Sequence, residues 1–61
     1  MREMNETVYY IVNGRRYSFR QLHVEGGILR GYCTRLKAWA SLFDTYFHVD
    51  SGPVFKAAKM G

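Results

Sequence analysis

The first third of the chain has the pattern of a β-hairpin. Two β-rich runs, Thr7–Val12 and Arg15–Phe19, flank the pair Asn13-Gly14. Both central residues of a tight hairpin turn adopt positive φ, so Asn-Gly between β-rich runs predicts a hairpin. The first run is apolar on both faces, with Val8, Tyr10 and Val12 on one and Tyr9 and Ile11 on the other. We therefore expect helices to cover part of this hairpin.

The next segment has the signals of a short helix. Ser18 and Gln21 have the spacing of a capping box, in which each side chain bonds an unpaired backbone amide of the first helical turn. The helix would run from Phe19 to about Glu25. It would end at Gly26-Gly27, because glycine accepts the left-handed conformation that terminates helices.

A longer helical pattern follows, from Leu29 or Arg30 to about Phe47. Its apolar residues recur at alternating steps of four and three, and would form a stripe within roughly 80° of a helix surface; they are Leu29, Cys33, Leu36, Ala40, Phe43 and Phe47. The opposite face would be polar, with Arg30, Thr34, Lys37, Ser41, Asp44 and His48. The pattern fits one helix, or two helices with a break near residues 37–39 and a second cap at Ser41.

The end of the chain predicts a turn and a short docking segment. Asp50–Pro53 is rich in turn residues, and Val54 and Phe55 could pack on the core. We expect residues 1–6 and 56–61 to be loose tails. The predicted fold is one small α+β domain, an N-terminal β-hairpin packed on two or three helices.

Composition supports a compact domain and excludes several classes. The 61 residues are 48% hydrophobic and 16% aromatic, which excludes a disordered tail, and the length excludes a multi-domain enzyme. One cysteine excludes an internal disulfide, and no run approaches the ~18 apolar residues of a membrane span. The start of the chain lacks the apolar run of a signal peptide. We expect a cytoplasmic protein that does not contact membranes.

Positive charge is concentrated in the middle of the chain. The net charge is +4, and residues 15–37 hold six basic residues and one acidic residue. Such a patch favours an anionic partner, nucleic acid first. The alternative is a solvated basic surface without a ligand.

Several central residues follow the spacing of a helix-turn-helix. Gly27 occupies the position of the turn glycine, and four apolar residues occupy the positions that support it: Leu22, Ile28, Cys33 and Leu36. Over about residues 10–42 the chain resembles small phage and prophage helix-turn-helix proteins. This resemblance implies a sequence-preferring double-stranded DNA-binding protein, a phage-type transcriptional regulator that acts as a homodimer. The alternative is that Gly26-Gly27 connects a plain pair of antiparallel helices.

The resemblance also implies which residues would touch DNA. Those that match groove-facing positions are Arg30, Gly31, Tyr32, Thr34 and Arg35. Arginine can present two donors to guanine, and threonine can contact a thymine methyl. Phosphate contacts would come from Arg15, Arg16, Arg20 and Lys37.

A second hypothesis uses an aromatic row. Tyr32, Trp39 and Tyr46 recur every seven residues, with Arg35 beside them. On a helix this row would either cover the hairpin as core or form an interface, since Tyr, Trp and Arg dominate binding energy. As an interface it would suit a second copy of the chain, or a host protein that a small phage-type protein inhibits.

The remaining candidates for chemistry are few. A third hypothesis is RNA binding through Tyr9, Tyr10 and Tyr17 on the hairpin. Cys33 lies in the apolar stripe and is expected to be inert, and His23 and His48 have no metal-ligand spacing. We find no nucleophile–base pair and no phosphate-binding glycine loop, so we expect no catalysis, metal or cofactor.

Overall fold

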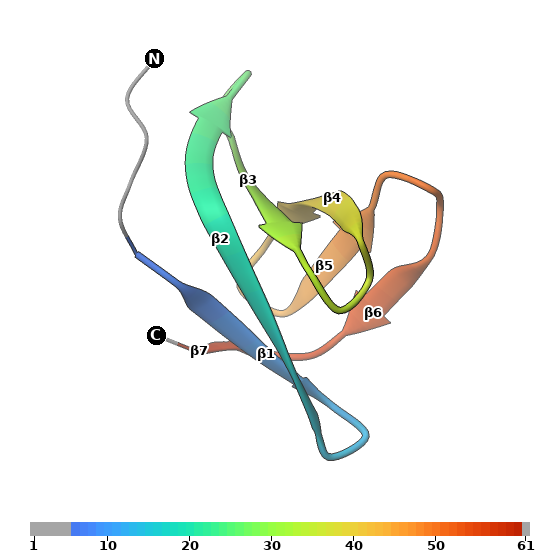
Figure 1. The fold of residues 1–61 in the computed structure, drawn as a ribbon. Coiled ribbons are helices and arrows are strands. Elements are labelled where there is room, and N and C mark those ends of the chain that lie inside the picture. The colour runs from blue at the N-terminus through green and yellow to red at the C-terminus, as the bar shows by residue number, and fades with distance from the viewer. Residues whose placement is uncertain (1–5, 61) are drawn as a thin grey trace.

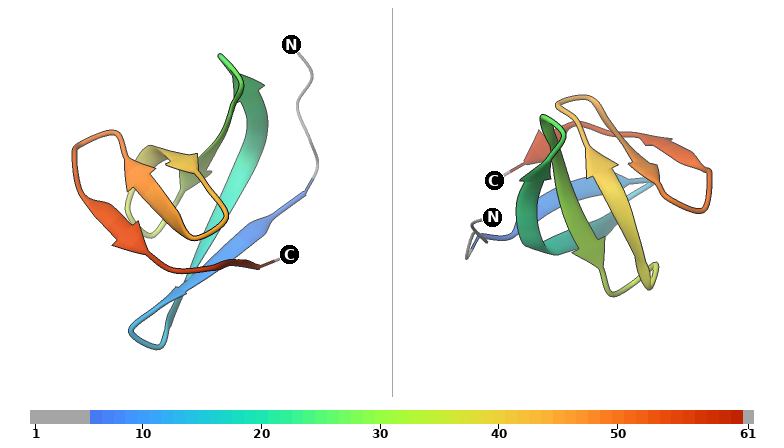
Figure 2. Two further views of the ribbon diagram at one scale, coloured as in Figure 1. Left: turned by 180° about the vertical axis from the view of Figure 1, so that it is seen from behind. Right: turned by 90° about the horizontal axis from the view of Figure 1, so that it is seen from above.

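The computed structural model describes residues 6–60 and places most of them in β-strands. There are seven strands in this range: β1 (Val8–Val12), β2 (Arg15–Glu25), β3 (Ile28–Cys33), β4 (Ala38–Leu42), β5 (Tyr46–Val49), β6 (Val54–Lys56) and β7 (Lys59–Met60). They form one antiparallel sheet in the order β6-β5-β4-β3-β2-β1-β7. The sheet curls into a half-barrel, as Figures 1 and 2 show from three sides. The protein is all-β, not α+β.

The C-terminal segment links the two edges of the curled sheet. β6 pairs with β5, while β7 pairs with β1, placing Lys59 opposite Tyr10. Only two residues separate β6 from β7, and the amides of Ala57 and Lys59 donate to the carbonyls of Thr45 and Asp44. The segment therefore passes from one edge to the other, and β7 lies beside β1 in Figure 1.

The core lies inside the curl and is built from rings. Tyr10, Phe19 and Phe47 are fully buried, and the Phe47 ring centroid lies 4.8 Å from that of Tyr10 and 4.9 Å from that of Phe19. The Tyr10 hydroxyl donates to the carbonyl oxygen of Phe43 at 2.7 Å. Burial raises the pKa of Tyr10 to about 12. Because strand residues alternate between faces, the core takes every second residue and leaves its neighbours outside.

A bulge in β2 interrupts this alternation. Arg20 pairs with Tyr32 and His23 pairs with Arg30, so two residues of β2 oppose the single residue Gly31 of β3. Gln21 lies in the bulge with φ +54°. A bulge bends its strand, and β2 is visibly curved in Figure 1.

Gly31 lies under the side chains that the bulge turns inward. A Cβ at Gly31 would lie 2.8 Å from Leu22 Cδ2 and 3.0 Å from Phe19 Cβ. The bulge thus brings Phe19 and Leu22 over the same point of β3, and only a residue without a side chain fits beneath them.

The predicted N-terminal hairpin is confirmed, but the helix after it is wrong. β1 and β2 pair through the Asn13-Gly14 turn, with φ of 51° and 78°. The expected helix from Phe19 to Glu25 is the second half of β2, and Ser18 caps nothing. Gly26-Gly27 forms a two-residue hairpin turn, with φ of 59° and 80°, in place of the helix-turn-helix turn.

The predicted helix over residues 29–47 is also wrong. This range contains β3, β4 and the start of β5, and the structure contains no helix within residues 6–60. A helix-turn-helix therefore has no recognition helix to insert into DNA. The phage-type regulator mechanism is overturned, and so is the host-protein inhibitor that would use a helix face.

The end of the chain follows the expected turn. Gly52 donates its amide to the carbonyl of Val49 at 2.8 Å within the predicted Asp50–Pro53 turn, and the half-buried Phe55 packs against the core. The predicted C-terminal tail contains β7, and the N-terminal tail, apart from Glu6, lies outside the described residues. No helix within residues 6–60 is long and apolar enough to cross a membrane.

Candidate functional site

The outer face of β2, β3 and β4 carries a row of side chains directly opposite one another. Arg20 pairs with Tyr32, and Tyr32 pairs with Trp39. The rings of Tyr32 and Trp39 are 5.5 Å apart at 66°, both half-buried, whereas Arg20 is exposed. We call Arg20, Tyr32 and Trp39 the outer row. It places a guanidinium and two aromatic rings on three adjacent strands.

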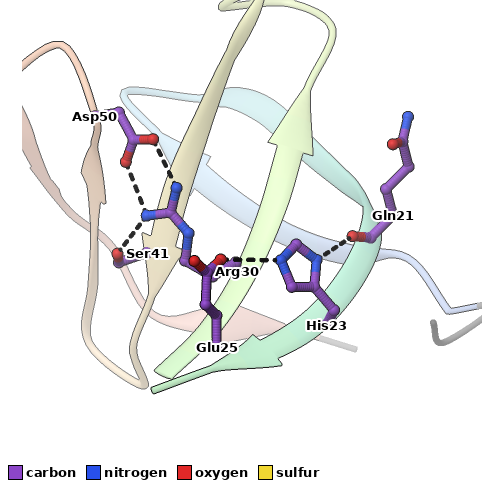
Figure 3. Close-up of polar contacts among 6 residues, drawn as sticks. All are labelled: Gln21, His23, Glu25, Arg30, Ser41 and Asp50. Carbon is purple, nitrogen blue, oxygen red and sulfur yellow. Dashed lines mark hydrogen bonds and ion pairs between the residues drawn. The ribbon is translucent and has the colours of Figure 1, made fainter. Parts of the chain in front are cut away.

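His23 extends the outer row along β2. Its ring lies 5.5 Å from the ring of Trp39, at 70°. Nδ1 is 3.1 Å from the Gln21 carbonyl oxygen, and Nε2 is 3.3 Å from Glu25 Oε1 (Figure 3). Both partners are acceptors, so both hydrogen bonds form together only when both ring nitrogens carry a proton. The bulge at Gln21 thus helps to hold His23 against Trp39.

Tyr9 and Arg16 form a second aromatic–cation contact on the same face. The Arg16 guanidinium carbon lies 5.0 Å from the centre of the Tyr9 ring, within the range of a cation–π interaction. Tyr9 pairs with Ser18 across β1 and β2. This contact extends the set of rings and arginines onto β1.

An open hollow of about 540 Å³ lies between β2 and the turn that joins β3 to β4. It is lined by Arg16, Ser18, Thr34 and Arg35, which we call the arginine hollow. The Arg35 guanidinium lies 5.6 Å from the centre of the Tyr17 ring, whose body is part of the core. Among residues 6–60, the lining carries two cations, two hydroxyls and no carboxylate.

Arg30 lies on the same face but is neutralised. Its Nη1 donates to Ser41 Oγ at 2.9 Å and to Asp50 Oδ1 at 2.8 Å, and its Nη2 donates to Asp50 Oδ2 at 2.6 Å (Figure 3). The hydrogen bonds between Arg30 and Asp50 raise the pKa of Arg30 and hold the pKa of Asp50 below its usual range. Arg30 thus links β3 to the end of β5, with its charge already paired.

The other arginines of this face are not neutralised by described residues. Three acidic side chains have basic partners elsewhere, since Asp50 pairs with Arg30, Glu25 with His23 and Asp44 with Lys59. Within residues 6–60, no ion pair involves Arg16, Arg20 or Arg35. The face combines aromatic rings with arginines that no acidic side chain of residues 6–60 neutralises.

The structure separates the other predicted site residues from the outer row. Arg15 begins β2 beside the hairpin turn, and Lys37 ends the β3–β4 turn with φ +53°. Tyr46, predicted to lie in one row with Tyr32 and Trp39, instead stacks on Phe43 at 4.5 Å. Of that row, only Tyr32 and Trp39 contact each other.

The hypothesis of RNA binding through three hairpin tyrosines is corrected by the direction of their side chains. Tyr10 and Tyr17 are buried in the core, and only Tyr9 faces outward. Ser18 and His23 were not identified from the sequence as site residues. Ser18 lies between the buried Tyr17 and Phe19, so a strand pattern would have placed it outside. Simple alternation would have placed His23 inside with Tyr17 and Phe19, and only the bulge at Gln21 turns it outward.

Metal-ligating residues are dispersed in the described part of the chain. No three His, Cys, Asp or Glu side chains of residues 6–60 are close enough together to hold a metal ion. Cys33 is a buried free thiol in the core.

Comparison of the chain with protein-family models, curated proteins and solved structures found no match. Functional assignment therefore depends on the geometry of the outer face.

Proposed function

We propose that this protein binds single-stranded nucleic acid along the outer face of β1–β4. The observation that carries the proposal is the outer row, in which the exposed Arg20 and two rings lie side by side across three strands. Arg16 on Tyr9 and the arginine hollow continue this pattern on the same face. Aromatic side chains stack on bases, and arginines neutralise the backbone that links them.

A single strand suits this surface better than a duplex. The bases of a duplex are already stacked on one another, so their faces are closed to protein rings, whereas a single strand can turn its bases onto Tyr32 or Trp39. Each stacked base contributes about 1–3 kcal/mol. A strand that covers the face would meet three arginines that form no ion pair with residues 6–60: Arg16, Arg20 and Arg35.

The first test is fluorescence anisotropy with a labelled single strand of about 12 nucleotides and with its duplex. Affinity is measured between about 50 and 200 mM salt, where release of counterions from single strands gives a log–log slope of about −0.7 per phosphate contact. Three arginine contacts predict a slope of about −2. Duplex binding equal to or tighter than single-strand binding would contradict the proposal.

Matched variants separate stacking from charge. Tyr32→Leu removes an outer ring and keeps an apolar side chain, so we expect a loss of about 1–3 kcal/mol in single-strand binding. Tyr46→Leu, which removes a ring on β5, should leave binding unchanged. Arg20→Gln should reduce the salt slope, while Lys56→Gln on β6, which removes the same charge, should have little effect. Equal losses from Arg20→Gln and Lys56→Gln would point to non-specific attraction by net charge. Equal losses from the two tyrosine variants would contradict stacking on Tyr32.

A further inference from the structure

The arginine hollow adjoins the outer row and has the donors of an anion site. We infer that it holds one internal phosphodiester group of the bound strand. The inference rests on the proposed function, because the phosphate is taken to belong to that strand. Its lining presents two guanidinium groups and two hydroxyls, from Arg16, Arg35, Ser18 and Thr34.

Each arginine of the hollow lies against an aromatic ring. Arg16 lies 5.0 Å from the centre of the Tyr9 ring, and Arg35 lies 5.6 Å from that of Tyr17. A guanidinium that rests on a ring loses less freedom when it binds an anion, and its planar donors match two phosphate oxygens. The hydroxyls of Ser18 and Thr34 can donate to the same group.

The position of the hollow fits a phosphate next to a stacked base. Ser18 is two residues before Arg20 on β2, and Thr34 is two residues after Tyr32, directly after the end of β3. Two residues of a strand span about 6.6 Å, so the hollow and the outer row are neighbouring rows of one face. A base on Tyr32 and a phosphate in the hollow can therefore belong to adjacent nucleotides. An internal phosphate is linked to a nucleotide on each side, so its site must leave room for the chain to continue in both directions. The hollow is open to solvent and meets this requirement.

The direct test uses inorganic phosphate alone, without an oligonucleotide. In a titration at constant ionic strength followed by amide NMR, we expect saturable shifts at Ser18, Thr34 and Arg35, with sulfate in place of phosphate giving the same pattern. Arg35→Gln should weaken this binding at least tenfold, and Lys56→Gln should not change it. Shifts spread evenly over all basic residues, or no shift at the hollow, would overturn the inference.

The second test uses the single strand of the anisotropy experiment. Arg35→Gln should reduce the magnitude of the salt slope by about 0.7, the value of one phosphate contact. Thr34→Ala keeps the charge and should weaken binding two- to fivefold without changing the slope. A terminal 5′-phosphate should change affinity less than twofold, because the site takes an internal group, and a tenfold gain would overturn that assignment.

The two proposals fail in different ways. Single-strand binding that depends on Tyr32 and Arg20 but not on Arg35 or Thr34 would overturn the hollow and leave the proposed function intact. Phosphate shifts at the hollow without any binding of single strands would overturn the proposed function, and with it the assignment of the phosphate to a strand.

Discussion

Tyr9 and Tyr10 are neighbours in β1, yet they belong to two different environments. Tyr10 points into the curl, is fully buried and donates its hydroxyl to the Phe43 carbonyl. Tyr9 points outward, is half-buried and lies against the Arg16 guanidinium. Tyrosine is thus a core residue on one face of the sheet and part of a charged surface on the other.

This difference extends to the two sets of rings. Inside, Tyr10, Phe19 and Phe47 contact one another, and every polar atom of the described buried side chains has a partner. Outside, Tyr32 and Trp39 lie next to arginine and histidine. Aromatic content alone therefore does not separate stability from binding. The inner rings contact mainly one another, whereas the outer rings lie next to basic side chains, and changes on each face can test this difference.

The largest effect is expected at the centre of the inner set. Phe47→Ala removes a fully buried ring that contacts Tyr10, Phe19, Tyr17 and Phe55, and should destabilise the fold by about 3–5 kcal/mol. On the outer face, Tyr9→Ala should cost less than about 1 kcal/mol. Urea denaturation measures both, and Phe47→Leu gives a milder variant if Phe47→Ala does not fold. Similar losses at Phe47 and Tyr9 would break the division between the faces.

Overpacking under the bulge should have the next largest effect. Gly31→Ala places a Cβ against Leu22 and Phe19 and should destabilise by about 2–3 kcal/mol. Ser18→Ala on the outer face of β2 is the control and should change stability by less than about 0.5 kcal/mol. When Gly31→Ala is combined with Leu22→Ala, the added methyl group should reduce stability less, because the Leu22 side chain that it would contact most closely has been removed. If the losses of stability from Gly31→Ala and Leu22→Ala simply add in the double variant, the contact with Leu22 is not the cause of the destabilisation by Gly31→Ala.

Alkaline pH should act on the inner tyrosine. The native pKa of Tyr10 is raised to about 12 from an ordinary value of 10.0, so its neutral form is favoured in the folded state. This contribution is fully present below about pH 10 and is lost as pH rises towards 12, a change on the order of 2 kcal/mol. Stability measured across this range should fall less steeply in Tyr10→Phe, while Tyr9→Phe should behave like the unchanged protein.

The smallest effect is expected from the ion pair on the outer face. The native pKa of Asp50 is lowered by its hydrogen bonds with Arg30, so the pair stabilises the fold at neutral pH and is lost as pH falls through that lowered pKa. Asp50 is half exposed, and such a pair contributes less than about 1 kcal/mol. Asp50→Asn should lower stability at pH 7 by this amount and leave it unchanged in strong acid. A loss that persists in acid would show that the ion pair is not its source.

The failure of the helix prediction has a specific physical cause. A step of four residues keeps a side chain on one face of a strand and also nearly completes a helical turn, so Leu29 to Cys33 in β3 fits both structures. Leu36 and Phe43, in contrast, lie in the connections before and after β4. The intervening steps of three cross the places where strands end: the turn after Cys33 and the end of β4 near Leu42. The apparent helical stripe therefore came from apolar residues that lie in successive strands and turns.

Gly31 concealed the strand pattern that would have corrected this. Leu29, Gly31 and Cys33 alternate with Arg30 and Tyr32, but a glycine does not mark an inward position in a hydrophobic pattern. Its burial is explained only by the bulge on the neighbouring strand. The turns at Asn13-Gly14 and Asp50–Pro53 were predictable because local residue chemistry determines them.

The candidate site was predictable in composition but not in geometry. The concentration of positive charge in residues 15–37 is plain from the sequence. The register that sets Arg20 beside Tyr32 depends on the bulge at Gln21, and the pairing of Arg30 with Asp50 depends on the distant end of β5. Both are long-range features, which no local pattern specifies.

The link between the two sheet edges has a consequence for the order in which the protein folds. β7 pairs with β1, so Met60 must reach Tyr9 from almost the opposite end of the described chain. On the ribosome, β1–β4 can pair while the chain is still growing, but the first strand keeps an open edge until residues 59–60 emerge. Contacts this distant in sequence form slowly. Pairing with β7 is thus the step that covers the exposed edge of β1, which could otherwise act as a template for aggregation.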